Sequence, residues 1–285
     1  MEDIKYWIWF SKIENISPKI LNKLLDKYKT PQSLWQKSEE ELIIDGINEK
    51  HIKEILNKSY KQNLDKYVEY MVKNNIGIIK ITDEDYPYKL KSIYDPPVVL
   101  YYKGNKKILN EQSVAIVGCR KCTTYGKNIS IKFAFELAKN NINVVSGLAE
   151  GIDSYSHIGA LNAKGNTIAV VGCGLDRVYP KQNKLLFEEI IKNNGVIISE
   201  YVIGIEPLAR NFPKRNRIIS GLSDLVIVVE AKQKSGTLIT VDFALEQGKE
   251  IYVVPGNINS INSVGTNELI KQGAQIITDI NDILK

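Results

Sequence analysis

Val114-Ala115-Ile116-Val117-Gly118-Cys119-Arg120 opens a region in which short apolar runs alternate with helix-like segments. Residues 114–117 are β-rich and almost purely apolar, as a strand buried on both faces should be. Similar runs lie at 143–145, 167–171, 196–198, 225–229 and 251–254. This alternation predicts an α/β fold with a doubly wound, mostly parallel, extended Rossmann-like sheet over residues 113–285.

The chain before this region has a different pattern. Residues 1–70 show helical periodicity interrupted by Thr30-Pro31 and Asp45-Gly46, which predicts a small all-helical domain of helix-hairpin-helix or sterile-alpha-motif type. Residues 71–112 contain the β-rich runs 76–81 and 98–102, which we expect to form a connector that extends the sheet at one edge. With 19 Lys against 17 acidic residues in positions 1–112, we favour a packing or accessory role for the helical domain.

Composition narrows the class of protein. The 285 residues are 44% hydrophobic and 25% charged, which is ordinary for a globular protein. No apolar run is long enough to span a membrane, and Met1-Glu2-Asp3 is acidic where a signal peptide would be basic. We therefore expect a cytoplasmic protein with no membrane association, whose three cysteines are reduced thiols. The net charge of +5 is mild, so a nucleic-acid partner would have to meet a local basic patch.

Small residues follow nearly every predicted strand. Doubly wound sheets bind ligands at the carboxyl ends of their strands, where glycine and serine let a ligand approach the backbone and helix starts can hold phosphate. The strand ends read Gly118-Cys119-Arg120, Ser146 to Gly151, Gly172-Cys173-Gly174, Ser199-Glu200, Glu230-Ala231 leading to Ser235-Gly236-Thr237, and Pro255-Gly256. These segments are the expected place of a ligand site.

A basic stretch, Phe212-Pro213-Lys214-Arg215-Asn216-Arg217-Ile218-Ile219, carries three cations at a predicted helix start. Pro213 suits the first helical position, so the cations fall at the positive end of the helix dipole, where a bound phosphate would offset their cost. Neutralising Arg215 is then expected to weaken binding without lowering stability. The alternative is that these cations form structural ion pairs, with Glu200 or Glu206 as partners.

All five arginines lie after residue 112, in a chain that otherwise uses lysine for its 38 Lys and Arg. Arginine concentrated in one region suggests sites that need a planar, bidentate donor.

Three other motifs are partial matches to known nucleotide, metal or catalytic motifs. Gly172-Cys173-Gly174 has Arg177 where a dinucleotide fingerprint has its third glycine. Cys119-Arg120-Lys121-Cys122 has C-x-x-C spacing but lacks the further ligands of a zinc ribbon. Asp153 and His157 could form an acid–base pair on one helix face, or could be a helix cap and a polar core residue. We predict no catalytic residue, no metal and no cofactor.

Seven ordered motifs over about 113–275 resemble the bacterial DNA-processing protein A (DprA/Smf) family. They are Gly118-Cys119-Arg120 with Tyr125-Gly126, Ser146-Gly147-Leu148-Ala149-Glu150-Gly151-Ile152-Asp153 with His157 and Ala160-Leu161, Tyr179-Pro180, Ser199-Glu200, Phe212-Pro213-Lys214-Arg215-Asn216-Arg217, Ser235-Gly236-Thr237 and Pro255-Gly256. The resemblance implies a cytoplasmic homodimer, without established catalysis, that binds and protects single-stranded DNA and helps load the RecA recombinase during DNA uptake or recombination.

The family's DNA pocket uses the arginine of a Gly-Ser-Arg motif and a basic Arg-Asn-Arg helix, which correspond here to Arg120, Lys214, Arg215 and Arg217. The full predicted DNA or phosphate site is Gly118, Cys119, Arg120, Gly147, Gly151, Phe212, Lys214, Arg215, Asn216, Arg217, Ser235, Gly236 and Thr237. Cys119 replaces the usual serine, and the chain ends at Leu284-Lys285, so the winged-helix domain that some members append is expected to be missing.

The alternative function is that of a nucleoside 5'-monophosphate phosphoribohydrolase, an N-glycosidase with a related sheet and a Gly-Gly-x-Gly-Thr-x-x-Glu loop. In Gly236-Thr237-Leu238-Ile239-Thr240, a threonine stands where that family has its catalytic glutamate. Without that carboxylate, the oxocarbenium-like transition state of hydrolysis would lack its stabilising charge.

Overall fold

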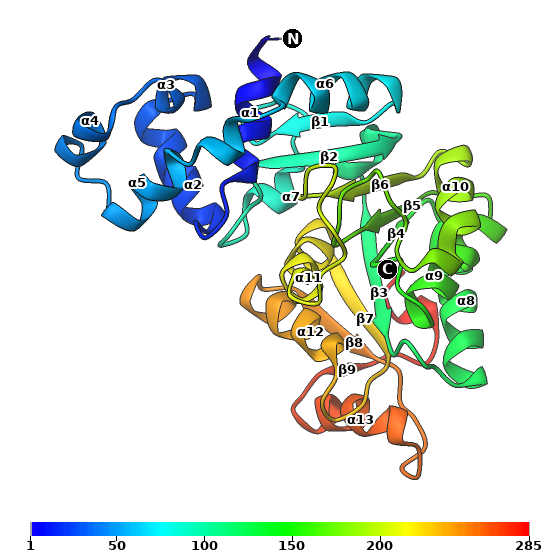
Figure 1. Ribbon diagram of the computed structural model, residues 1–285. Helices are drawn as coiled ribbons and strands as arrows, with labels where there is room; N and C mark the ends of the chain where they lie inside the picture. Colours follow the sequence, from blue (N-terminus) through cyan, green and yellow to red (C-terminus); the bar gives the residue numbers. More distant parts are fainter. Residues whose placement is uncertain (1, 285) are drawn as a thin grey trace.

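The computed structural model describes residues 2–284 and is organised around one mixed sheet of nine strands (Figure 1). The strand order across the sheet is β1-β2-β6-β5-β4-β3-β7-β8-β9. The strands are β1 (Gly77–Lys80), β2 (Val99–Gly104), β3 (Ser113–Gly118), β4 (Asn143–Ser146), β5 (Thr167–Val170), β6 (Val196–Ser199), β7 (Leu225–Glu230), β8 (Glu250–Val253) and β9 (Gln275–Ile276). All six runs predicted after residue 112 form strands, which confirms the α/β class.

Seven strands that are neighbours across the sheet, in the order β6-β5-β4-β3-β7-β8-β9, pair in parallel. At the edge beyond β6, β2 pairs antiparallel with β6 and β1 pairs antiparallel with β2. This edge is the predicted extension: Tyr101 of β2 lies opposite Ser199 of β6, and Ile79 of β1 lies opposite Leu100. The central strands are buried along their whole length, because helices cover both faces of the sheet. The sequence analysis did not find β9, which is only two exposed residues long.

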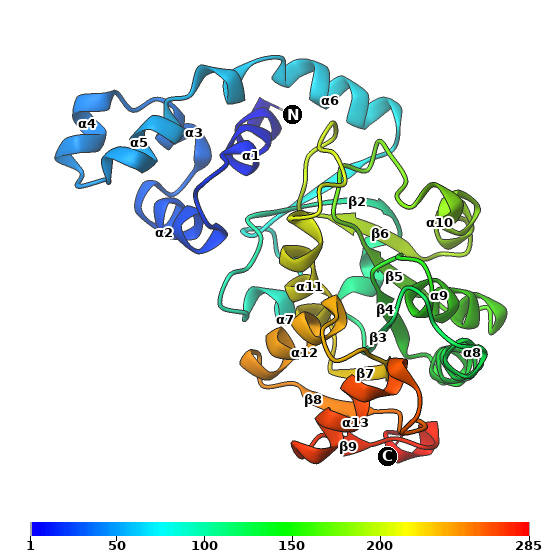
Figure 2. The same cartoon turned by 60° about the horizontal axis from the view of Figure 1, so that its bottom comes forward.

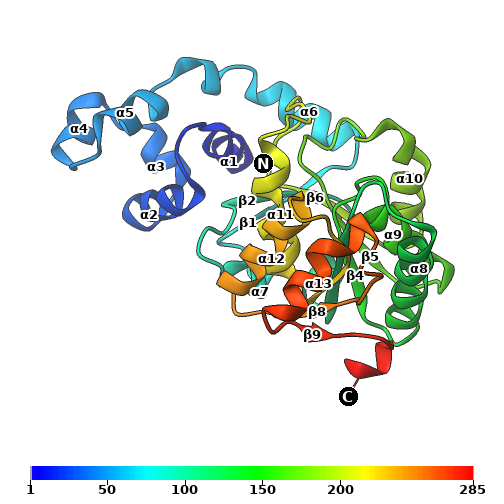
Figure 3. The same cartoon turned by 90° about the horizontal axis from the view of Figure 1, so that it is seen from below.

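Helices flank the parallel strands on both sides. Those of the α/β region are α8 (Thr124–Lys139), α9 (Ile152–Asn162), α10 (Lys184–Lys192), α11 (Asn211–Leu222), α12 (Gly236–Glu246) and α13 (Val264–Lys271), with short 3-10 turns η3 (Lys181–Asn183), η4 (Ile261–Ser263) and η5 (Ile280–Asp282). Figure 3 shows α8, α9 and α10 on one side of the sheet and α11 and α12 on the other. This arrangement is the doubly wound architecture that the sequence predicts.

The first part of the described chain is helical, as expected. Its elements are α1 (Glu2–Lys12), α2 (Pro18–Tyr28), α3 (Pro31–Trp35), α4 (Glu39–Ile44), α5 (Glu49–Ile55), η1 (Lys58–Lys61) and α6 (Leu64–Lys73), with α7 (Tyr88–Lys91) and η2 (Lys106–Asn110) in the connector. Local capping explains these short helices: Ser17 and Thr30 cap helices that have proline in their first turn, and Ser38 forms a capping box with Glu41.

Helices α2 to α5 extend to one side of the sheet, whereas α1 and α6 lie over β1 and β2 (Figures 1 and 2). The buried apolar residues of the helical region and of one face of the sheet nevertheless form one continuous core, and a second cluster lies on the other face. Trp9 packs edge-on against Trp35 with ring centroids 5.1 Å apart, and the Ser11 hydroxyl lies 2.6 Å from the Tyr101 hydroxyl on β2. No helix within residues 2–284 is long and apolar enough to cross a membrane.

One helix start differs from its prediction. Helix α11 begins at Asn211, so Pro213 is its third residue and not its first. A proline is tolerated there because the amides of the first turn have no partner inside the helix. The three cations therefore sit two residues further into α11 than the sequence predicts, and two of them, Arg215 and Arg217, are buried.

Candidate nucleic-acid site at the strand ends

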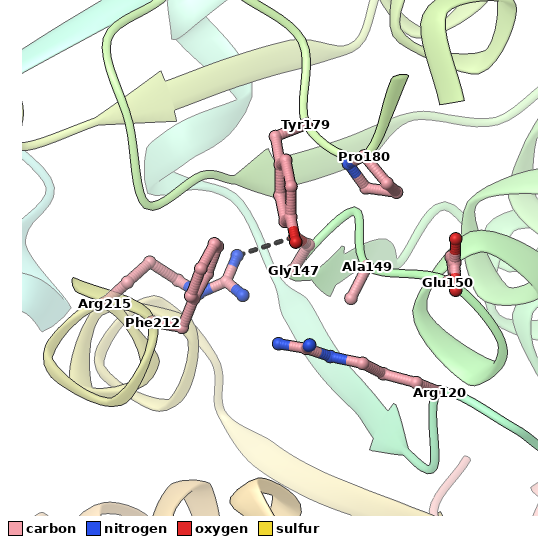
Figure 4. Close-up of a pocket in the computed structure, with 8 residues that line it drawn as sticks. All are labelled: Arg120, Gly147, Ala149, Glu150, Tyr179, Pro180, Phe212 and Arg215. Atoms are coloured by element: carbon pink, nitrogen blue, oxygen red, sulfur yellow. Dashed lines mark hydrogen bonds between the residues drawn. The ribbon is translucent and has the colours of Figure 1, made fainter. Parts of the chain in front are cut away.

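A small pocket of about 70 Å³ lies beyond the carboxyl ends of the central strands (Figure 4). Loops that follow β3, β4 and β5 and the first turn of α11 supply its walls. The lining residues are Arg120, Gly147, Ala149, Glu150, Tyr179, Pro180, Phe212 and Arg215. Four of the predicted site residues, Arg120, Gly147, Phe212 and Arg215, thus meet in one place although they are far apart in the sequence.

Arg215 forms the floor of this pocket and is only 4% exposed. Its Nη1 donates to the carbonyl oxygens of Gly147, at 2.6 Å, and Val170, and its Nε donates to Oδ1 of Asn216. No carboxylate among residues 2–284 lies within ion-pair distance of it, and its Nη2 has no hydrogen-bond partner there. Burial lowers the pKa of this guanidinium, and the charge of Arg120 acts in the same direction against the opposing effect of Asp153.

Arg120 approaches the same space from the loop after β3. Its side chain is exposed, and its Cζ lies 5.5 Å from the centre of the Phe212 ring, a cation–π contact. Figure 4 shows the guanidinium groups of Arg120 and Arg215 directed into the same space. Within the described chain Arg120 makes no ion pair or side-chain hydrogen bond. Two cations with free donors facing one small space are suited to an anion, because each would otherwise repel the other.

An aromatic surface stands beside the two cations. The rings of Tyr179 and Phe212 are tilted by 33° with centroids 5.4 Å apart, and Tyr179 is 41% exposed. Exposed aromatic rings next to cations are the usual means of binding single-stranded nucleic acid. Tyr179 lies in the pocket but is not among the site residues predicted from the sequence. The signal that could have identified it is an aromatic residue in the loop after a buried strand.

Arg217 does not share this pocket. It donates from Nη1 and Nη2 to the two carboxylate oxygens of Glu200, at 2.9 and 2.7 Å, and from Nε to the Asp95 carbonyl. Burial alone would lower the pKa of Arg217, but the charge and hydrogen bonds of Glu200 raise it. The geometry thus favours the structural ion pair with Glu200, and Arg217 does not line the pocket in which Arg120 and Arg215 meet.

Lys214 is exposed and lies on another side of α11. It lines a larger groove of about 1030 Å³ between the helical region, including Ile13 and Ile16, and the loop after β6. Lys214 and Arg215 therefore do not converge on one phosphate. A strand bound in the pocket would have to cross the start of α11 to reach Lys214.

The predicted glycines serve mainly to let the loops pack on one another. A Cβ on Gly151, whose φ is +80°, would lie 2.3 Å from the Arg120 carbonyl oxygen, and one on Gly147 would lie 2.6 Å from Arg215 Nη2. Gly118 is held similarly tightly against Ile152, and Cys119 is buried. These residues thus let the loop after β3, which carries Arg120, pack against the loop after β4, and let the loop after β4 pack against Arg215.

The start of α12 lies next to the pocket through Asn216. The amide of Asn216 donates to the Gly236 carbonyl at 3.2 Å while its oxygen accepts from Arg215. Ser235 precedes the helix without capping it, and its buried hydroxyl has no partner among the described residues. Thr237 is buried, whereas the Gly236 Cα faces open space.

The Asp153–His157 pair matches the plainer interpretation for His157, a polar core residue, but not for Asp153, which was expected to cap the helix. His157 is fully buried, and its Nδ1 lies 2.7 Å from the Thr167 hydroxyl, which itself donates to the Val144 carbonyl. Nδ1 must therefore carry the proton. Burial, and secondly the charge of Arg215, lowers the pKa of His157 to about 3, so it is a neutral core residue at pH 7. Asp153 accepts from the Ala149 amide at 3.4 Å and steadies the loop rather than capping α9.

The cysteines show no sign of redox or metal chemistry. Cys119 and Cys173 are buried, Cys122 is half-buried, and burial raises the pKa of all three thiols. A thiol that reacts as a nucleophile needs the opposite shift. Residues 2–284 contain no cluster of His, Cys, Asp and Glu that could hold a metal ion.

Comparison with known proteins gives a consistent result. A sequence model of the DNA recombination-mediator protein A family matches residues 77–285. The chain is 46% identical over 204 residues to DNA processing protein DprA of Streptococcus pneumoniae, with 72% of each chain covered. It is 37% identical over 284 residues to protein Smf of Synechocystis, covering 98% of this chain and 71% of that one.

Two solved structures are also similar. The X-ray structure of DprA from Streptococcus pneumoniae superposes with a TM-score of 0.84 at 38% identity, covering 98% of this chain and 96% of the other. A structure of DNA processing protein A from Helicobacter pylori, described by its single-stranded DNA binding mode, gives a TM-score of 0.67 at 37% identity over 73% of this chain and 94% of that one.

Proposed function

Because the chain belongs to the DNA recombination-mediator protein A (DprA/Smf) family, we propose that it binds single-stranded DNA with a backbone phosphate between Arg120 and Arg215. The observation that carries this proposal is the convergence of two guanidinium groups, both with free donors and neither with a carboxylate partner, on one pocket. The single-stranded DNA binding named for the Helicobacter pylori protein supports it.

The size of the pocket suits this assignment. A pocket of about 70 Å³ between two guanidinium groups has room for a phosphate. A base attached to that phosphate would lie outside, against the exposed ring of Tyr179. Base stacking on an aromatic ring tolerates every sequence, because each base has a π-face.

A second phosphate position is proposed at the start of α12. Ser235, Gly236 and Thr237 lie beside Asn216, which connects them to Arg215. A helix start without a capping side chain leaves amide donors for an anion. Lys214, on another side of α11, would contact the strand after it crosses that helix.

The remaining proposals rest on the family alone. They are that the protein acts in the cytoplasm, protects incoming or processed single strands and helps to load the RecA recombinase. Residues 1–70 are proposed to pack against the sheet rather than to bind DNA, and their shared core with β1 and β2 supports this. Formation of a homodimer is also proposed; light scattering that finds a monomer at tens of micromolar, by order of magnitude for a weak symmetric interface, would contradict it.

Filter binding on oligo(dT), with duplex DNA as competitor, tests the main proposal. We expect preference for the single strand and, for about three to five phosphate contacts, a log–log salt slope of about −2 to −4. Equal affinity for duplex, or no dependence on salt, would contradict it. Incubation with AMP tests the hydrolase alternative: we expect no free base, because Thr240 is 2% exposed and lies in the core.

A further inference from the structure

The crevice between β3 and β7 is the place where a doubly wound sheet ordinarily binds a nucleotide. From β3 the strand order runs through β4, β5 and β6 in one direction and through β7 and β8 in the other, so the topology switches between β3 and β7. At such a switch point the phosphate lies at the start of the helix that follows the first strand. The corresponding helix here is α8, which begins at Thr124 with Thr123 as its N-cap.

A carboxylate of the protein itself occupies this position. Glu230 ends β7, is 2% exposed and accepts hydrogen bonds from the Thr123 amide, at 2.9 Å, and from the Thr123 hydroxyl. Asn262, in the turn before α13, donates to the same carboxylate at 3.4 Å. No cation among residues 2–284 forms an ion pair with Glu230. Its carboxylate oxygens instead accept hydrogen bonds from groups that could otherwise donate to a phosphate.

The carboxylate also fills the available space. A Cβ on Gly126, in the first turn of α8, would lie 2.5 Å from Cδ and 2.6 Å from Oε2 of Glu230. The helix start is therefore closed by contact, not only by charge.

The same residue holds the loop that carries Arg120. The Glu230 backbone accepts from the Cys119 amide at 2.9 Å, and its side chain holds Thr123 at the other end of the loop. Asn262 adds a hydrogen bond of 2.8 Å to the carbonyl of Lys121, between these two points. The loop between β3 and α8 is thus held at Cys119, just before Arg120, and at Lys121 and Thr123, after it.

We propose that Glu230 takes the place of a nucleotide phosphate at the switch point, and so excludes free nucleotides and pyrophosphate from the start of α8. Anions are left with the pocket between Arg120 and Arg215. Exclusion does not depend on DNA binding; the positioning of Arg120 by Glu230 does rest on the function proposed above.

Pyrophosphate is the probe for this proposal. Titrations by calorimetry use the Arg120→Gln background, so that the DNA pocket cannot account for any gain. Adding Glu230→Ala is expected to increase pyrophosphate affinity by roughly tenfold or more, because it removes a negative charge and frees the donors of Thr123 and Asn262. Glu230→Gln, which still fills the space, is expected to remain closed.

Ile227→Ala, which weakens the core on the same strand without opening a polar site, is the matched control. The proposal is overturned if folded Glu230→Ala binds pyrophosphate no better than its parent, or if Ile227→Ala gains as much. If Glu230→Ala does not fold, recovery of the native circular dichroism spectrum by pyrophosphate, but not by chloride at equal ionic strength, supports the proposal. Failure of that recovery counts against it.

Discussion

Helix α11 buries two arginines two positions apart, and the structure treats them differently. Arg217 meets Glu200 through two charge-assisted hydrogen bonds and lies near Asp95 on the side of the connector. Arg215 faces the strand ends, where its buried partners are carbonyl oxygens and its remaining donor opens into the pocket. The two pKa shifts have opposite signs, raised for Arg217 and lowered for Arg215.

This difference separates a structural cation from one suited to a ligand. A buried charge is stable only if it is paired, and Arg217 has its counter-charge within the fold. Arg215 has no carboxylate within ion-pair distance, and the buried Asp153, which raises its pKa from further away, does not overcome the effect of burial. An external anion would supply the direct partner that the protein does not. The charge of a residue in a basic motif therefore does not identify its role; its carboxylate partners do.

Loss of the paired arginine should have the largest effect. Arg217→Met leaves Glu200, whose side chain is only 12% exposed, without its cation, and we expect a loss of about 3 kcal/mol in the free energy of unfolding. Urea unfolding of the DNA-free protein measures it. Adding Glu200→Leu should restore much of the loss, since both charges are then removed; a double variant as unstable as the single one would show that the pair is not the cause.

The same substitution at the unpaired arginine should act mainly on binding. For Arg215→Met we expect oligo(dT) affinity to fall by roughly 1–3 kcal/mol. Stability should fall less than in Arg217→Met, because the Gly147 and Val170 carbonyls lose a donor but an uncompensated charge also disappears.

Lys214→Met is the matched control for this experiment, because it removes an exposed charge from the same helix on another side. Its affinity loss should stay below about 1 kcal/mol. Equal losses at 214 and 215 would mean that the pocket does not hold the phosphate.

Acid should lower stability less than loss of the Arg217 ion pair does, and the effect of acid reports on the charge of Arg215. His157 has a pKa of about 3 in the folded protein, below its ordinary value of 6.5, so the unfolded chain gains a proton first as the pH falls. Its contribution is complete well above pH 6.5 and is lost towards pH 3; at pH 5.5 we expect a loss on the order of 1 kcal/mol.

Urea unfolding at pH 8 and pH 5.5 measures this loss. His157→Gln should remove it, whereas a change at the other histidine, His51→Gln, should not. In Arg215→Met the loss should be smaller, because the charge of Arg215 contributes to the lowered pKa. An unchanged loss in that variant would show that Arg215 does not act on His157.

The sequence predicts the strands well because buried parallel strands are apolar without interruption, as in 114–117 and 196–198. β9 lacks this signal, since both of its residues are exposed. The start of α11 was misplaced by two residues, because a proline fits any position in the first turn of a helix.

The site is less accessible to sequence reasoning. The basic motif and the strand-end loops could be identified, but not which arginine would be paired. Glu200 lies 17 positions from Arg217, and only the packing of the loop after β6 against α11 brings them together. The inward direction of Glu230 is likewise set by the crevice between two strands, and nothing in the residues beside it indicates that direction.

The contact between Trp9 and Trp35 has a practical consequence, because the chain has three tryptophans and all lie within its first 35 residues. Tryptophan fluorescence therefore reports on the helical region, while the pocket contains tyrosine and phenylalanine but no tryptophan. Emission during denaturation and ellipticity of the whole chain should change together, because the two regions share one core. A change in emission when oligo(dT) binds would show that occupation of the pocket is transmitted to the far end of the molecule.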